Sequence, residues 1–254
     1  MTDAMDLKRL LHHDDFPRSS NYDPEWVIAN EMGPNVLWLT EALSEVMDLR
    51  PGMRVLDLGC GRAMSSIFLA RELGVQVWAT DLWIPAAENA ARIREAGLED
   101  QVFPVHAEAR RLPYADDFFD AIVSLDAFHY FGTDVHYLEF YLLKLLKRGG
   151  RLGIVVPAAL VEGPLPDCLP ATEWYWINSV AWWGRHWARY PEVELELSEP
   201  LAGGWEMWVR WLEFLEASGR ANRAEENSRE LAQLRADGGK YVGFVRQVAR
   251  RRPG

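Results

Sequence analysis

Between Met53 and Pro157 the chain alternates short apolar runs with stretches of helical periodicity, and this alternation limits the folds that are open to it. The apolar runs are RVLDL, VQVWATD, QVFPVHA, DAIVSLD and RLGIVVPA, and the helical stretches between them include SSIFLARELG and AAENAARIREAG. Strands that alternate with helices in this way form parallel sheets with helices on both faces. The pattern therefore predicts a doubly wound α/β fold.

Patterns outside this region add a leading helix and two further strands. Asp23 and Pro24 match the cap and first turn of a helix, and the apolar spacing from Val36 to Val46 predicts a packing helix. Two strand candidates near the C-terminus are VELELSE and KYVGFVRQVAR. We therefore expect a mostly parallel seven-stranded sheet with an antiparallel C-terminal strand.

Charge and cysteine content restrict the partners and the location of the chain. Twenty-seven basic and 38 acidic residues leave a net charge of −11, which repels nucleic acids and anionic membrane surfaces. Cys60 and Cys168 are too few for a disulfide framework, and no apolar stretch is long enough to span a membrane. We expect a cytoplasmic protein with no nucleic acid partner and no membrane span; the sequence does not indicate its oligomeric state.

A glycine-rich turn, Gly59-Cys60-Gly61, follows the first predicted strand. The two glycines let the backbone approach a ligand and adopt positive φ, and the free N–H groups of the following helix offer a site for an anion. The turn therefore predicts binding of a nucleotide or an amino-acid carboxylate. Taken alone it is weak evidence, because glycine pairs also occur in loops that bind nothing.

Asp81 ends the second predicted strand, twenty-two positions beyond Gly59. Adjacent parallel strands end at the same edge of a sheet, so its carboxylate is placed to accept hydrogen bonds from both hydroxyls of a ribose. The alternative role is to cap the helix of IPAAENAARI. The glycine turn beside Asp81 favours the ribose.

Two positions separate the possible nucleoside cofactors. The nicotinamide fingerprint has a third glycine where this chain has Met64. Asp57, two residues before the first glycine, is placed to face a cation such as an amino-acid ammonium group. Both features argue against a dinucleotide.

The segments VLDLGCGRA, ATDLW, HAEARRLPYADDFFDAIVSLD and LLKRGGRLGIVV together resemble the motif series of class I, Rossmann-like S-adenosylmethionine-dependent methyltransferases. The resemblance covers about residues 52 to 157 and implies S-adenosylmethionine as cofactor and S-adenosylhomocysteine as product. It also implies a cofactor site in which Glu108 departs from the Asp that many relatives carry. That site consists of Asp57, Gly59, Cys60, Gly61, Asp81, Leu82, Glu108, Ala109 and Leu125.

The same resemblance divides the chain, which we expect to be a single domain over residues 1–254. The parts are an N-terminal arm with helices over 1–50, a cofactor-binding core over 52–157, a substrate lid insertion over 158–190 after the fifth strand, and C-terminal strands and helices over 191–254.

In the family, the segment after DAIV passes between cofactor and acceptor, and here it contains Asp126, His129 and Tyr130. We expect His129 or Asp126 to serve as an optional catalytic base, because only an acceptor that arrives protonated needs one. We expect Tyr130 on the acceptor side. The alternative is that the aromatic residues of this segment pack under the following helix.

Eight of the twelve tryptophans lie between Trp174 and Trp211. Aromatic faces stabilise cations and exclude water, so the predicted lid suits an amine or an apolar ring. The alternative is that these side chains form core. The residues expected to contact the acceptor from the lid and from the N-terminal arm are Trp174, Trp176, Trp183, Tyr22 and Trp26.

The histidines and cysteines lack the spacing of metal ligands, so no metal is predicted. We expect an enzyme that moves a methyl group from S-adenosylmethionine to a small molecule, with an amine slightly preferred over an O, S or C acceptor. The alternatives are an NAD(P)-dependent oxidoreductase and a non-catalytic, S-adenosylmethionine-binding regulatory protein.

Overall fold

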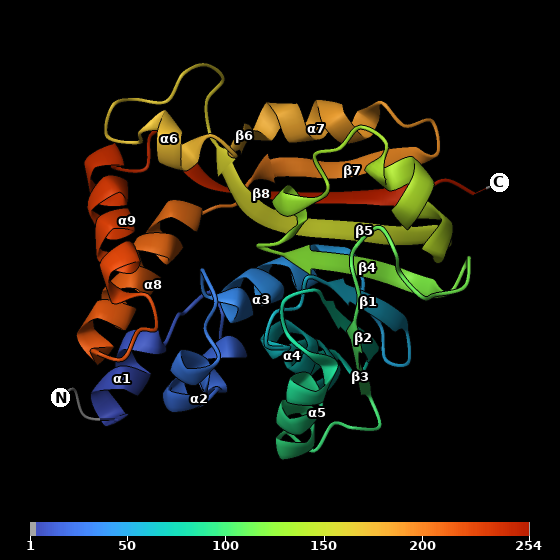
Figure 1. The fold of residues 1–254 in the computed structure, drawn as a ribbon, viewed down its shortest axis with the longest axis horizontal. Helices are drawn as coiled ribbons and strands as arrows, with labels where there is room; N and C mark the ends of the chain where they lie inside the picture. The colour runs from blue at the N-terminus through green and yellow to red at the C-terminus, as the bar shows by residue number, and fades with distance from the viewer. Residues whose placement is uncertain (1–3, 254) are drawn as a thin grey trace.

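The computed structural model describes residues 4–253 and places eight strands in one sheet (Figure 1). Strands β1 to β5 run parallel, β8 runs antiparallel to β5, and β7 runs antiparallel to β8. The order is β3 (Val102–His106), β2 (Gln76–Asp81), β1 (Arg54–Leu58), β4 (Phe119–Leu125), β5 (Leu146–Ala159), β8 (Val242–Arg251) and β7 (Val193–Pro200). A two-residue strand, β6 (Asn178–Ser179), pairs with the end of β5 and makes the count one more than predicted. The predicted doubly wound fold is confirmed.

The strand order reverses between β1 and β4. The chain runs outward from β1 through β2 to β3 and then returns to the other side of β1 to form β4. The loops that follow β1 and β4 therefore diverge at the carboxyl end of the sheet, and ligands of open α/β sheets bind in the crevice that such a reversal leaves.

Alternating side chains of the inner strands supply two apolar layers. Val55 and Val77 face a layer with α3 (Val36–Met47) and α4 (Met64–Leu73), whereas Leu56 faces a layer with α7 (Val180–Ala188). Successive side chains of a strand point to opposite faces, which is why one strand serves both layers. The remaining helix of the alternating region, α5 (Ala86–Glu95), packs against β3.

The predicted N-terminal helix region forms two helices instead of one. Asp23 caps α2 (Pro24–Ala29) by accepting from the Glu25 N–H at 3.2 Å, and Asn35 caps α3 by accepting from the Leu37 N–H at 3.1 Å. A second cap starts a second helix, so residues 30–35 form a loop. Before them lie α1 (Ala4–Leu11) and the short turn η1 (Ser19–Asn21).

Most of the helices outside the alternating core gather at the end of the sheet toward which β5 points, on the left in Figure 1. They are α1, α2, α6 (Ala171–Trp174), α8 (Gly204–Ser218) and α9 (Ala224–Asp237). The segment YLEFYLLKLL forms a π turn, η3 (Leu138–Leu142), and a 3-10 turn, η4 (Leu143–Leu145). A further 3-10 turn, η2 (Phe128–Tyr130), follows β4.

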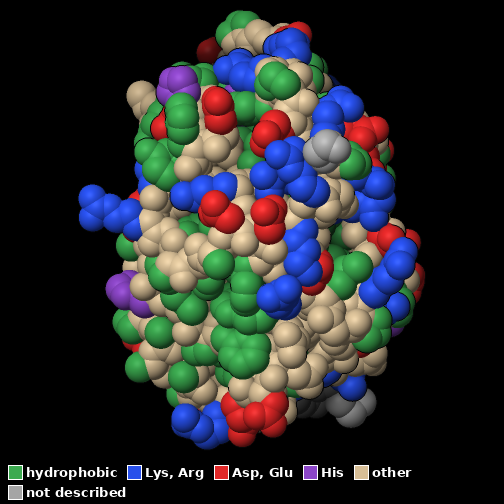
Figure 2. All heavy atoms as spheres, turned by 90° about the vertical axis from the view of Figure 1, so that its right-hand side faces the viewer, with side chains coloured by type: hydrophobic (Ala, Val, Ile, Leu, Met, Phe, Trp, Pro, Cys, Tyr) green, Lys and Arg blue, Asp and Glu red, His purple; other side chains and the backbone are tan. Residues whose placement is uncertain are grey.

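The opposite end of the sheet carries basic and acidic side chains side by side (Figure 2). Arg151 bonds to Glu196 at 2.6 Å, and Arg148 lies 3.5 Å from Glu192. Each of these two arginines thus has a carboxylate partner on this face. Within the described residues, no helix is long and apolar enough to cross a membrane.

Candidate functional site

A cavity of about 250 Å³ opens at the carboxyl ends of β1, β2 and β4, where the strand order reverses. Its walls come from the loops after these strands, the loop after β3 and the loop between α2 and α3. The predicted cofactor residues on this wall are Gly59, Cys60, Gly61, Asp81, Leu82, Glu108, Ala109 and Leu125. The fold thus brings together eight of the nine predicted cofactor residues, all but Asp57.

The glycine turn is held in shape by the neighbouring strand. The Gly59 N–H donates to the Thr80 carbonyl at 2.8 Å, and the Cys60 N–H donates to the same oxygen at 3.2 Å. Gly59 has φ +78°, and a Cβ added to it would lie 2.4 Å from Ala127 Cβ. Both the left-handed backbone and the close approach of the segment after β4 require glycine here.

Asp81 ties this turn to the loop after β2. Its Oδ2 accepts from the Gly61 N–H at 2.8 Å, and its Oδ1 accepts from the N–H groups of Trp83 at 2.7 Å and Ile84 at 2.9 Å. Two carboxylate oxygens offer about four lone-pair positions, so these three bonds leave capacity for a ligand hydroxyl. The alternative role of Asp81 as a helix cap is wrong, because the N-cap residue of α5 is Pro85 and no side chain caps this helix; the Asp81 carboxylate instead holds the loop that precedes it.

The rest of this end of the cavity is apolar and open. Leu82 is half exposed, and its neighbour Trp83, which was not among the predicted site residues, is 63% exposed and also lines the cavity. Glu108 turns toward Arg110, since its Oε2 accepts from the Arg110 N–H at 2.9 Å. A tryptophan two positions after Asp81, the acid predicted to hold the ribose, is the sequence signal that could have identified Trp83.

Asp57 lies behind the cavity wall. It is fully buried, and its Oδ2 accepts from the hydroxyls of Ser65 and Ser66, each at 2.6 Å. Burial raises the pKa of this carboxyl to about 6, although the two serine hydroxyls act in the opposite direction. The structure therefore gives Asp57 a role in holding the start of α4, and its predicted contact with a cofactor ammonium group has no direct path from the cavity.

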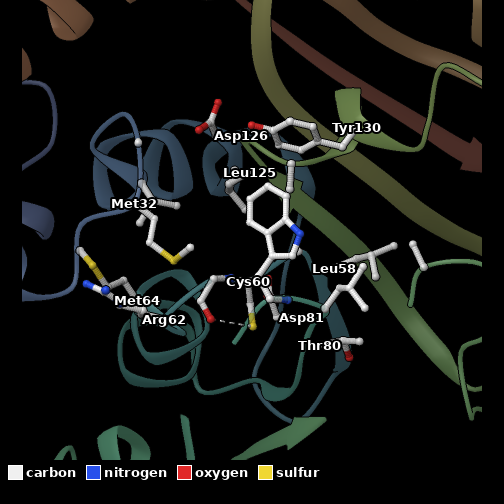
Figure 3. Close-up of a pocket in the computed structure, with 18 of the residues that line it drawn as sticks. Met32, Leu58, Cys60, Arg62, Met64, Thr80, Asp81, Leu125, Asp126 and Tyr130 are labelled. Atoms are coloured by element: carbon white, nitrogen blue, oxygen red, sulfur yellow. Dashed lines mark hydrogen bonds between the residues drawn. The ribbon is translucent and has the colours of Figure 1, made fainter. Parts of the chain in front are cut away.

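Asp126 stands at the other end of the cavity, beside Tyr130 (Figure 3). Its backbone is in the left-handed region at φ +51°, a conformation that is uncommon for residues other than glycine. Within residues 4–253 its carboxylate makes no hydrogen bond or ion pair. Burial raises the pKa of this carboxyl to about 8, and the nearby Glu230 carboxylate adds to the rise. Asp126 is thus a protonatable group that faces the cavity and has no hydrogen-bond or ion-pair partner in the described part of the chain.

His129 and Tyr130 differ in their access to the cavity. Tyr130 lines it and is 62% exposed, with its ring 5.3 Å from that of Trp83 in an edge-to-face pair. His129 is buried outside the cavity lining, and burial lowers the pKa of its imidazole to about 4. Its Nδ1 has no hydrogen-bond partner among the described residues. The imidazole is therefore neutral at pH 7 and is one residue removed from the cavity.

The N-terminal arm reaches the cavity through residues that were not among the predicted ones. Tyr22 and Trp26, predicted to contact the acceptor, instead pack together at 5.7 Å, and the Tyr22 hydroxyl donates to Glu72. The loop of residues 30–35 and Val36, the first residue of α3, line the cavity in their place. The helix break that creates this loop depends on Asn35, a strong capping residue, and this cap is the signal that could have found it.

The three lid tryptophans occupy three different environments. Trp183 is completely buried beside Phe128, at 6.1 Å between ring centroids. Trp174 is buried and stacks on Trp176 at 6.1 Å, and Trp176 stacks on His129 at 4.9 Å. None of the three lines the cavity at the glycine turn. Trp183 is therefore a core residue, as the alternative interpretation of these tryptophans expected, because a side chain without exposed surface cannot contact an acceptor.

The residues present fit a nucleoside with an amino-acid tail. The turn at Gly59 offers close backbone approach, Asp81 retains an acceptor for a ribose hydroxyl, and Leu82 offers an apolar surface for a base. Among the described residues, no group of three His, Cys, Asp or Glu side chains is arranged to hold a metal ion.

Known methyltransferases are similar to the core of this chain. A family model described as a methyltransferase domain matches residues 55–150. The methyltransferase GfsG of Streptomyces halstedii is 35% identical over 162 residues, which are 63% of this chain and 55% of that protein. The 27-O-demethylrifamycin SV methyltransferase of Amycolatopsis mediterranei is 32% identical over 117 residues, 46% of this chain and 43% of that protein. The chain thus spans about half the length of these relatives, and the resemblance drawn from the sequence motifs is confirmed over the core.

A solved structure extends the likeness to most of the fold. The cyclase SpnF matches with a TM-score of 0.68 and 22% identity, over 85% of this chain and 81% of that one. At this identity the match establishes the shared fold alone, and one fold hosts different reactions.

Proposed function

We propose that this protein, whose residues 55–150 form a methyltransferase domain, transfers a methyl group from S-adenosylmethionine to a small molecule. One observation carries the proposal: Asp81 and the turn at Gly61 are joined by a hydrogen bond on the wall of a cavity whose far end holds Asp126. A cofactor site and a group able to accept a proton thus share one cavity.

The chain holds the cofactor at one end of the cavity and leaves the other end for the acceptor. Gly59 and Gly61 would lie against its methionine part, Asp81 would accept from the ribose, and Leu82 and Ala109 would border the adenine. S-adenosylmethionine supplies an already activated methyl group. The residues around it therefore have to orient the acceptor at about 3 to 3.5 Å and to exclude water.

Asp126 is the catalytic residue of this proposal. An acceptor amine or hydroxyl has to lose a proton, and a base is most effective when its pKa lies near the working pH. The raised pKa of Asp126, about 8, meets this condition. His129 was expected to share this role, but its depressed pKa and its place outside the cavity lining favour Asp126.

An amine acceptor is preferred over an oxygen, sulfur or carbon acceptor. Burial raises the pKa of both Asp126 and Glu230, so ionising either carboxyl in the apo protein is costly. A bound ammonium group would lower that cost, because opposite charge within a few ångströms favours the charged form of a carboxyl. Tyr130 and Trp83 add aromatic faces on which such a cation can rest.

Two titrations and one assay test the proposal. Calorimetry with S-adenosylhomocysteine and with NAD, on protein freed of bound ligand, should show binding of the first alone. Binding of NAD would instead support the oxidoreductase alternative. Methyl transfer from labelled S-adenosylmethionine to a panel of amines, phenols and thiols then separates an enzyme from a regulatory protein, which would bind S-adenosylhomocysteine and methylate nothing.

A further inference from the structure

A second cavity, of about 350 Å³, lies among the loop after β5, α6 and the start of α7. It is distinct from the cavity at the glycine turn, since the two share no lining residue. Most of its wall is apolar. The apolar lining residues are Ala159, Val161, Pro164, Leu165, Ala171, Trp174, Tyr175, Ile177 and Trp182.

Its aromatic residues present surface that the fold itself does not use. Tyr175 is 81% exposed, more than any other large apolar side chain among the described residues. Trp182 is fixed from behind, because His186 stacks on it at 4.5 Å with an interplanar angle of 12°. A rigid indole and an exposed phenol beside one cavity form a surface that suits a flat ring.

The charges in this lining cancel one another. Glu162 and Arg185 form an ion pair, and the Ser179 hydroxyl lies 3.5 Å from the same glutamate. Glu162 and Arg185 are the charged residues of the lining, and each is paired with the other. The cavity therefore offers no unpaired charge to an ionic ligand.

Two series of contacts connect this cavity with the first. In the first series, the ring centroid of Tyr130, on the wall of the first cavity, lies 4.1 Å from that of His129. The His129 ring stacks on Trp176, and Trp176 stacks on Trp174, which lines the second cavity. In the other series, His186 lies under Trp182 and its Nε2 is 2.9 Å from the Gly132 carbonyl oxygen, one residue from Phe131 of the first cavity. Both series of contacts pass through residues 129–132, which include the end of the η2 turn.

We propose that the second cavity binds an uncharged ring of the methyl acceptor, whose reactive group lies in the first cavity beside Asp126. The ring would stack on Tyr175 and Trp182. The assignment of this ring to the acceptor rests on the proposed methyltransferase function, whereas binding of a ring does not. The acceptor class is therefore a molecule with an apolar ring system and a separate amine or hydroxyl.

The first experiment measures ring binding alone, with 2-naphthol as the probe and calorimetry as the readout. Wild-type protein is titrated with and without saturating S-adenosylhomocysteine, and Tyr175→Ala, Trp182→Ala and Phe140→Ala are titrated alongside. Phe140 is a matched control because its ring is 56% exposed and lies in neither cavity. Tyr175→Ala is the decisive variant, since so exposed a side chain adds little to folding.

We expect 2-naphthol to bind equally well with S-adenosylhomocysteine present, and Tyr175→Ala and Trp182→Ala to weaken it by about two- to tenfold, the usual range for an aromatic pair. Phe140→Ala should leave the affinity unchanged. Displacement of 2-naphthol by S-adenosylhomocysteine, or equal affinity in all four proteins, would overturn the site.

The second experiment tests the link to the acceptor. Amines that carry a 2-naphthyl ring on linkers of two to eight carbons are offered with labelled S-adenosylmethionine. We expect one linker length to be methylated fastest in the wild type and to lose this advantage in Tyr175→Ala. A methylation rate that does not depend on linker length and is the same in wild type and Tyr175→Ala would refute the assignment of the ring to the acceptor. If no amine is methylated, the proposed function fails, and the 2-naphthol titration still decides whether the cavity is a ring site.

Discussion

Gly33 lies directly against Asp126: a Cβ atom added at Gly33 would stand 2.6 Å from Asp126 Oδ2. The indole of Trp211 fixes this glycine by donating to its carbonyl at 2.7 Å. The loop between α2 and α3 therefore packs onto the proposed base with no room for a side chain.

Gly33→Ala should lower methyl transfer by at least about tenfold while S-adenosylhomocysteine binds nearly as well as in wild type. The methyl group would displace the Asp126 carboxylate, and small misplacements of catalytic groups have large kinetic effects. Gly204→Ala is the control, because a Cβ there has neighbours no closer than 3.3 Å. Full turnover in Gly33→Ala, or an equal loss in Gly204→Ala, would show that the contact with Asp126 is unimportant.

Gly59→Ala should abolish measurable S-adenosylhomocysteine binding. The added Cβ meets Ala127 and the φ of +78° is strained for alanine, so the turn has to move. Gly97→Ala isolates the strain, because Gly97 has φ +68° and open space around its Cβ position. We expect Gly97→Ala to cost about 1 kcal/mol of folding free energy without any change in affinity. Calorimetry and thermal melting on both variants measure the two effects, and intact binding by Gly59→Ala would contradict this account of the turn.

Asp81→Asn should weaken S-adenosylhomocysteine binding by about 1 to 3 kcal/mol and also lower the melting temperature, since three backbone N–H groups depend on this carboxylate. Asp237→Asn is a matched control. Its carboxylate likewise accepts from backbone N–H groups, those of Tyr241 at 3.0 Å and Val242 at 3.4 Å, and it lies outside the cavity lining. That variant should lose stability and keep its affinity; the same affinity loss in both would remove Asp81 from the ribose site.

Asp126→Asn should change how stability depends on pH. The pKa of this carboxyl is about 8 in the folded protein, above its ordinary value of 3.8, so the folded state holds the proton more tightly than the unfolded chain. The resulting stabilisation is complete below about pH 4 and is lost as pH rises through 8. Asparagine is neutral at every pH, so the stability of the variant relative to wild type should increase as pH rises from 4 to 8 and stay constant above that. Urea unfolding from pH 4 to 9 measures this, and parallel curves for the two proteins would refute the raised pKa.

The same variant should depress methyl transfer by about 10²- to 10⁴-fold, the usual contribution of a positioned base. In wild type, kcat/KM should rise with pH up to an apparent pKa near 8, because the deprotonated carboxylate is the active form. A rate that is flat from pH 6 to 9, or an Asp126→Asn variant of undiminished activity, would exclude Asp126 as the base.

The predicted lid tryptophans should divide into two groups. Trp183→Ala removes a completely buried indole and should cost about 3 to 5 kcal/mol of folding free energy, with activity falling only as far as the folded fraction does. Trp176→Ala, in contact with His129, should lower turnover more than it lowers stability. Melting temperature and turnover measured on both variants decide this, and a selective turnover defect in Trp183→Ala would restore it to the acceptor site.

The sequence determined the features that depend on local pattern. The alternation from Met53 to Pro157 predicted the parallel strands, because the period of an apolar pattern is set by the local backbone. The glycines at 59 and 61 and the acid at 81 predicted one end of the cavity, because parallel neighbours end at a common edge. These residues needed only short-range geometry to be found.

The tertiary structure decided what each residue faces. Gly33 and Asp126 are 93 positions apart in the chain, and only the folding of the arm over the strand ends brings them together. Asp57 was expected at the ligand, yet the hydroxyls of Ser65 and Ser66 bind its carboxylate behind the wall. The sequence does not distinguish Trp183 from Tyr175, since both are aromatic residues of the predicted lid. In the fold Trp183 is completely buried and Tyr175 is exposed. Burial is a property of the whole fold, so no local pattern encodes it at a single position.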